Sequence, residues 1–140
     1  MHRICIYAHI NIYTGRGEIV VDIFKALSEE SRLRILTLLM EREMCVCEIE
    51  VCLDMTQSNA SRHLTVLKNC GILNCYKKAQ WAYYGISDSF KKEHKDLWKY
   101  LQHKMIELPT YQADHEQCEK YKTVDVCANS KIIHERREKK

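Results

Sequence analysis

Apolar side chains recur along the chain at two different periods, which together predict a mainly helical fold with one small hairpin. From residue 18 to residue 108 most of them repeat every three or four positions, as they do on one face of a helix. The predicted helices cover residues 18–27, 29–41, 47–53, 57–70 and 88–108. Residues 72–78 and 81–86 are strand-like and flank a two-residue turn, as expected of a β-hairpin.

Two of these helices are separated only by a tight turn. Thr56 suits the N-cap of the second one, and Gly71 suits its end. On the second helix a core-facing stripe lies opposite a small, polar and basic outer face. A helix, a turn and a helix with such a face is the helix-turn-helix pattern, and the hairpin that follows predicts a wing. The core-facing stripe consists of Ala60, Leu64 and Leu67.

The pattern divides the chain into three parts. Residues 1–16 alternate in polarity and end at a glycine-containing breaker, so an N-terminal arm is expected there. Residues 17–108 form the predicted DNA-binding and dimerisation domain, a winged helix-turn-helix. Residues 109–140 form a polar, cysteine-containing tail with at most a short helix around 113–121.

The last long helix predicts a dimer. Its apolar stripe has no remaining partner in so small a domain, so a second copy of the chain is the expected cover. The stripe comprises Phe90, Leu97, Leu101, Met105 and Leu108.

The distribution of charge says more than the formal net charge of +3. Residues 18–54 carry nine acids against four bases. Residues 55–87 carry no acid at all, while Arg62, Lys68, Lys77 and Lys78 make this stretch positive. An acid-free stretch over the predicted helix and wing favours a polyanionic partner, which here means double-stranded operator DNA.

Side chains at the start of the second helix and at the hairpin tip are therefore candidate DNA contacts. Those on the helix would reach base edges and phosphates, and those on the hairpin would lie along the backbone or minor groove. The candidates are Gln57, Ser58, Asn59, Ser61, Arg62, His63, Lys77, Lys78 and Gln80.

Length and composition indicate the number of domains and the cellular compartment. At 140 residues the chain is long enough for one domain with a packed core. It contains no run of about 18 apolar residues and no signal-peptide core, so neither a membrane span nor export is expected, and the protein should be cytoplasmic. Eight cysteines in a reducing compartment favour metal binding or redox sensing over structural disulfides.

Cys45 and Cys47 are the candidate metal ligands. Positions two apart diverge by about 200° on a helix but share a face in an extended segment. Joint chelation therefore requires the following helix to open its first turn or to start only near Cys47. Paired thiolates prefer soft ions such as As(III), Sb(III), Cd(II) and Pb(II). Cys118, Cys127 or Cys5 could supply a third sulfur, whereas Cys52 borders the core stripe and is interpreted as structural.

Several motifs in this order resemble the ArsR/SmtB-type family of metal-sensing repressors, over about residues 21–108. They are the segments at residues 22–28 and 31–36, the Cys-Val-Cys segment at 43–49, the helix start at 57–64 and the wing strand at 81–86. The resemblance implies a dimeric winged-helix repressor that leaves its operator when it binds a metal or metalloid.

Within that family the Cys-Val-Cys segment is similar to the one in the arsenite and antimonite sensors, and also to the one in the cadmium and lead sensors. The position of the arsenic sensors' third cysteine holds Glu50, and only Cys5 is available where cadmium sensors have two N-terminal cysteines. The zinc sensors of the family have a histidine ligand on the last helix, and this chain has Phe90 at that position. The implied inducer is arsenite or antimonite, with cadmium, lead or zinc as the alternative.

Other classes predict different patterns. A thiol oxidoreductase would show Cys-x-x-Cys or an activated cysteine, and no Cys-x-x-Cys occurs, so the chain is not expected to be an enzyme. A structural zinc-binding module would show paired ligand knuckles at fixed spacing, which these cysteines do not offer. A repressor of the same fold that responds to thiol oxidation remains a rival.

Overall fold

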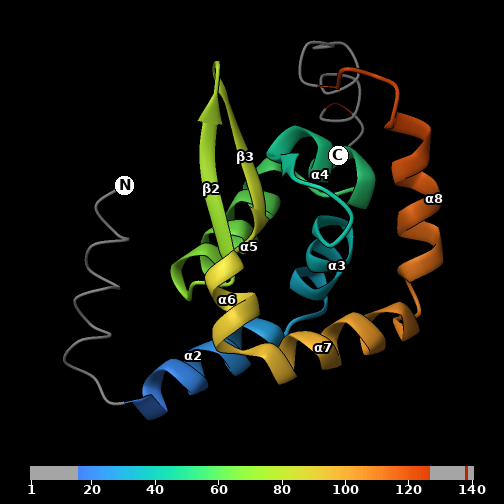
Figure 1. Cartoon of the computed structure of the whole chain (residues 1–140). Coiled ribbons are helices and arrows are strands. Elements are labelled where there is room, and N and C mark those ends of the chain that lie inside the picture. The colour runs from blue at the N-terminus through green and yellow to red at the C-terminus, as the bar shows by residue number, and fades with distance from the viewer. Residues whose placement is uncertain (1–15, 127–137, 139–140) are drawn as a thin grey trace.

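The computed structural model describes residues 16–126 and residue 138, and shows a mainly helical domain with a small sheet (Figure 1). None of its described helices is both long and apolar enough to cross a membrane. Most of the expected arm at residues 1–16 lies outside the described residues, as do Cys5 and Cys127. In order, the helices are α2 (Arg16–Leu27), α3 (Glu30–Leu39), α4 (Val46–Leu53), α5 (Gln57–Asn69), α6 (Asp88–Glu93), α7 (Lys95–Lys104), the 3₁₀ turn η1 (Met105–Glu107) and α8 (Tyr111–Tyr121).

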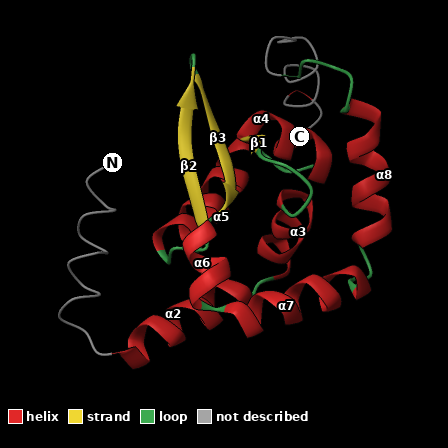
Figure 2. Cartoon of the chain, in the orientation of Figure 1, coloured by secondary structure: helices red, strands yellow, loops and turns green. Residues whose placement is uncertain are grey.

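A three-stranded antiparallel sheet stands beside the helices (Figure 2). Its order is β1-β3-β2, with β1 (Met44–Cys45), β2 (Leu73–Lys78) and β3 (Trp81–Ile86). The predicted hairpin is confirmed as β2 and β3, which pair from Leu73↔Ile86 to Lys78↔Trp81. Strand β1 was not expected, because two residues are too short to show a period.

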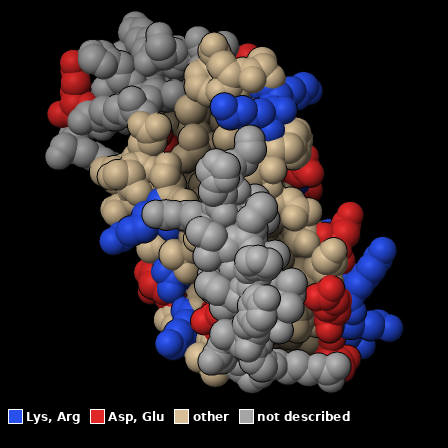
Figure 3. Space-filling model, turned by 90° about the vertical axis from the view of Figure 1, so that its left-hand side faces the viewer, with Lys and Arg blue, Asp and Glu red and all other residues tan. Residues whose placement is uncertain are grey.

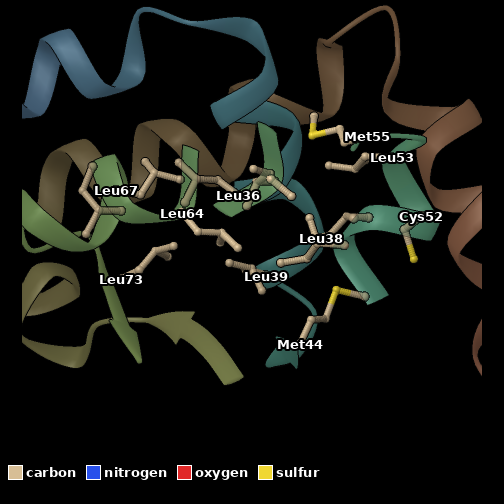
Figure 4. Packing of buried hydrophobic residues seen from close by; sticks show 14 of the residues in the cluster. Leu36, Leu38, Leu39, Met44, Cys52, Leu53, Met55, Leu64, Leu67 and Leu73 are labelled. Carbon is tan, nitrogen blue, oxygen red and sulfur yellow. The ribbon is translucent and has the colours of Figure 1, made fainter. Parts of the chain in front are cut away.

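The core lies where α3, α4, α5 and the base of the hairpin meet (Figure 4). The inward stripe predicted for α5 is confirmed, since its three side chains are completely buried. They pack among Ile35 and Leu36 from α3 and Ile49 from α4, all of which are at most 1% exposed. The position of α5 is thus fixed by apolar packing along one whole face.

The region predicted as one long helix over residues 88–108 is divided. His94 leaves the helical region at φ −118° and ψ 46°, which separates α6 from α7. The idea that its apolar stripe lacks a partner is wrong, because Phe90, Leu101 and Met105 are buried in the chain's own core and Leu97 and Leu108 pack against it.

A different apolar face is left exposed. On α2, Val20, Val21 and Phe24 are 46%, 49% and 56% exposed. Tyr100 on α7 and Ile106 on η1 are exposed to a similar degree. Helices α2 and α7 lie along the same edge of the molecule in Figure 1.

The short helix expected around residues 113–121 is confirmed as α8, and it packs against α3 and α4. Arg34 on α3 donates two hydrogen bonds to the Asp114 carboxylate, at 2.8 Å from Nε and 2.7 Å from Nη2. Asp114 is only 5% exposed, and this bond is the main reason why the pKa of Arg34 lies above its ordinary value. A bidentate, largely desolvated ion pair therefore anchors the C-terminal helix.

Removing this anchor should destabilise the protein. Asp114→Ala leaves the half-buried Arg34 guanidinium without its carboxylate, and we expect a loss of about 2 kcal/mol in the free energy of unfolding. Urea unfolding at a fixed protein concentration measures it. Glu119→Ala, on the exposed side of the same helix, removes only the surface pair with Lys122 and should shift the midpoint little. Equal shifts for the two variants would contradict the anchoring role.

Candidate nucleic-acid interface and thiol site

Helices α4 and α5 are joined by a three-residue turn whose geometry is fixed at every position. Asp54 caps α4 in the left-handed region, at φ 54° and ψ 45°. The Met55 N–H donates to the Glu50 carbonyl at 3.1 Å, and the Met55 side chain is buried. The Thr56 hydroxyl accepts a hydrogen bond from the Asn59 N–H at 3.3 Å, which confirms the predicted N-cap. A change in the angle of α4 should therefore also change the position of α5.

The start of α5 presents polar side chains to the outside. Gln57, Ser58, Asn59 and Arg62 are exposed, and Ser61 is half-buried. The Arg62 guanidinium donates to the Asn59 side-chain oxygen at 3.2 Å, which orients both groups on the outer face. Because the first turn contains no acid, the positive end of the helix dipole is not neutralised by its own side chains. The face is suited to phosphate oxygens and base edges.

His63 behaves differently from its neighbours, because its side chain is only 7% exposed. Its Nδ1 lies 3.4 Å from the Arg32 guanidinium and 3.5 Å from the Glu29 carboxylate, both at the start of α3. Burial lowers the pKa of His63, with Glu29 opposing and Arg62 adding to the shift. The imidazole therefore ties α5 to α3, and in this structure it does not share the outer face with Arg62.

The hairpin tip carries the remaining candidate contacts. Lys77, Lys78 and Gln80 are exposed, and Ala79 between them adopts a positive φ of 54°. Figure 3 shows basic side chains near the top of the molecule, where the hairpin ends. The tip is therefore a narrow, positively charged projection beside α5, as a wing requires.

Cys45 and Cys47 lie on the two sides of a strand-to-helix junction. Cys45 is the last residue of β1 and the N-cap of α4, with extended φ −81° and ψ 164°, and Cys47 is the second residue of the helix. The helix starts at Val46, close to the start near Cys47 that joint chelation was argued to require. Both side chains are buried, at 1% and 6% exposure, so a bound ion would be held away from water.

An ion pair holds this junction in place. The Glu48 carboxylate accepts the Cys45 N–H at 2.9 Å through one oxygen and pairs with the Arg42 guanidinium at 2.9 Å through the other. Burial lowers the pKa of Arg42, but the hydrogen bond and charge of Glu48 outweigh it, so the pKa is raised overall. Sequence reasoning missed this cap, although a glutamate three residues after an N-cap is its usual signal.

The structure brings no third ligand to this pair within residues 16–126, where no three Cys, His, Asp or Glu side chains converge on a metal-sized site. Cys45 is disulfide-bonded here, whereas Cys52, Cys70, Cys75 and Cys118 are free thiols. Cys118 lies instead against Cys52, across the α4–α8 contact. Cys5 and Cys127 lie outside the described residues.

Comparison with known proteins gives a consistent result. The family described as "Bacterial regulatory protein, arsR family" matches residues 29–74. An uncharacterized HTH-type transcriptional regulator of Methanocaldococcus jannaschii, MJ1325, is 43% identical over 77 residues, which is 54% of this chain and 86% of that protein. A cadmium resistance regulatory protein CadC homolog of Staphylococcus aureus is 37% identical over 53% of this chain and 62% of its own length. The arsenical resistance operon repressor of Escherichia coli is 41% identical over 48% and 58%.

These two resistance regulators are matched over somewhat less than two thirds of their length. Among solved structures, the homodimeric winged helix-turn-helix DNA-binding domain Mb0332 of Mycobacterium bovis, titled a possible ArsR-family regulator, is 28% identical. It superposes with a TM-score of 0.54 over 61% of this chain and 80% of that domain. The helix-turn-helix, the wing and these matches place the chain in the arsR family of bacterial regulatory proteins.

Proposed function

We propose that this protein is a dimeric transcriptional repressor that binds operator DNA and is released when Cys45 and Cys47 bind a thiophilic ion, with arsenite or antimonite as the inducer. The observation that carries the proposal is the position of the two cysteines at the junction that leads directly into the helix-turn-helix. The arsenical repressor of Escherichia coli supports a metalloid inducer. The cadmium regulator homolog of Staphylococcus aureus supports cadmium as a second candidate.

DNA binding would use α5 and the wing together. The exposed start of α5 offers amide, hydroxyl and guanidinium groups to the major groove, and the lysines at the hairpin tip reach adjacent phosphates. His63 would act indirectly, by holding α5 against α3. In two copies of the chain the two α5 helices would read half-sites about one helical turn apart.

Release would follow from the geometry of the junction. In the reduced protein the Cys45 and Cys47 thiolates would hold the ion, whose role is to draw two sulfurs to one centre. Since Cys45 is extended and Cys47 is helical, bringing their sulfurs together favours a conformation in which the first turn of α4 is opened or re-angled. The fixed turn at Asp54 and Met55 then transmits the change to α5. Only a difference in affinity between the two conformations is needed.

The exposed apolar face on α2 and α7 is the proposed dimer interface. Its five large side chains are exposed on elements that lie along the same edge of the molecule, and exposed apolar surface of this kind is typical of a protein–protein interface. A homodimeric relative of the same fold supports a second copy as its cover.

Arg62→Ala should weaken binding to DNA from upstream of the protein's own coding sequence. Loss of one charged contact costs roughly 1–3 kcal/mol, or about ten- to a hundredfold in Kd. Fluorescence anisotropy at several salt concentrations measures it, and the salt slope should become less steep by about one unit if the contact is to a phosphate. Lys120→Ala, an exposed basic residue on α8, is the control and should leave both quantities unchanged. Wild-type affinity independent of salt would rule out the proposed interface.

Cys45→Ser and Cys47→Ser should each retain DNA binding but lose its response to the inducer. A gel shift titrated with arsenite, antimonite, cadmium, lead, zinc and peroxide measures the concentration that releases half of the DNA. We expect at least a tenfold rise for each variant, because a single remaining thiolate cannot chelate. Cys75→Ser, on β2, is the matched control and should respond normally. A double serine variant that still lets go of DNA at the wild-type arsenite concentration would remove the proposed mechanism.

Phe24→Glu should convert the protein to a monomer. The change places a charge in the most exposed part of the apolar patch on α2, where dimer formation would have to desolvate it. Light scattering after size-exclusion chromatography gives the mass. Val124→Glu, at an exposed apolar position beyond α8, should leave the mass at twice that of the chain. A wild-type protein that is already monomeric at micromolar concentration would contradict the interface.

A further inference from the structure

A second pair of thiols lies away from the Cys45–Cys47 junction. Cys52 is near the end of α4 and Cys118 is near the end of α8, and their side chains are 2% and 8% exposed. Both belong to the buried cluster at the α4–α8 contact, where each thiol lies close enough to shift the pKa of the other. Figure 4 shows Cys52 on α4, at the edge of the buried cluster. Sixty-six positions separate the two cysteines in sequence, so only the folded chain brings them together.

The contact between the two helices is well defined. Helix α8 packs along α4, and Gln117 donates from its side-chain nitrogen to the Val51 carbonyl at 3.4 Å. These are the immediate neighbours of Cys118 and Cys52, so the backbones on both sides of the thiol pair are held. The Arg34–Asp114 ion pair fixes α8 one turn earlier. The two cysteines therefore lie in the same α4–α8 contact, on backbones that are anchored on both sides.

The charges around the pair distinguish its two sulfurs. The hydrogen bond from Cys52 lowers the pKa of Cys118, burial opposes the shift, and the positive charge of Arg42 adds to it. The same hydrogen bond, followed by burial, raises the pKa of Cys52. Cys118 is also the more exposed of the two, at 8% against 2%, so it is the sulfur that a peroxide would reach first. This asymmetry is the one expected of an attacking and a resolving cysteine.

We propose that Cys52 and Cys118 form a redox-active dithiol that hydrogen peroxide converts into a disulfide between α4 and α8. The Cys118 thiolate attacks one peroxide oxygen, the O–O bond breaks, and water leaves as Cys118 becomes a sulfenic acid. The Cys52 sulfur then attacks the Cys118 sulfur, the S–O bond breaks, and a second water leaves. The two sulfurs together lose two electrons, which reduce one peroxide.

The consequence is a covalent clamp on the first helix of the helix-turn-helix. The clamp would not use Cys45 or Cys47, so it does not depend on the proposed inducer. It would nevertheless act close to their junction. Arg42 interacts electrostatically with both Cys52 and Cys118. Arg42 also pairs with the Glu48 carboxylate, which accepts the Cys45 N–H.

Peptide mapping tests the clamp in the full-length protein. Trypsin leaves residues 43–62 and 105–120 as peptides, and Cys118 is the only cysteine in the second. In the Cys45→Ser/Cys47→Ser variant Cys52 is the only cysteine in the first. One equivalent of hydrogen peroxide should join these two peptides in most molecules, with a loss of two hydrogens, and dithiothreitol should separate them. The peptide at residues 69–77, which contains Cys70 and Cys75, is the internal control and should still be alkylated.

Single variants test the assigned roles. With Cys52→Ala, Cys118 should be trapped by dimedone as a sulfenic acid. With Cys118→Ala, Cys52 should react with peroxide at least tenfold more slowly, and the urea midpoint should no longer rise on oxidation as it does in the protein with both cysteines. The proposal is overturned if residues 69–77 are oxidised first, or if Cys118 gains oxygen in the Cys45→Ser/Cys47→Ser variant without a cross-link. Neither result would bear on release by arsenite, so the two proposals can fail separately.

Discussion

Helix α4 is buried over six of its eight residues, and the arrangement of the other elements depends on that constraint. It contacts α3, α5, α8, β1 and β3. A helix enclosed in this way cannot move alone, since each neighbour fills space that its side chains occupy. A small movement at either end of α4 therefore requires α4 and the elements around it to adopt a different packing. In this way a chemical change at one residue can produce a discrete conformational change.

The helices and strands in which apolar residues follow a regular pattern could be predicted from sequence. The inward stripe of α5 and the two strand-like segments on either side of a short turn predicted the helix-turn-helix and the wing, and Thr56 marked the helix start correctly. These elements succeed because local propensity and tertiary packing favour the same structure. The metal-binding role of Cys45 and Cys47 stays a prediction, and the structure shows that β1 ends and α4 begins between them.

Other features depend on contacts between residues distant in sequence, which a period cannot show. The ion pair of Arg34 and Asp114 spans 80 positions and makes α8 part of the packed domain. The break at His94 turns an apparently unpartnered stripe back into the core. The inward orientation of His63 follows from Glu29 and Arg32, which lie on another helix. His63 was accordingly assigned to the outer face, because its partners on α3 cannot be read from the period of α5.

The pairing of Cys45 with Tyr83 connects the thiol junction to the wing as well as to the helix-turn-helix. Cys45 is at once a member of the sheet that carries the hairpin and the cap of the helix that precedes α5. A chemical event at this one residue can therefore disturb both α5 and the hairpin, the two elements proposed to contact DNA, in a single step. Losing both proposed contacts at once would weaken DNA binding far more than losing either one.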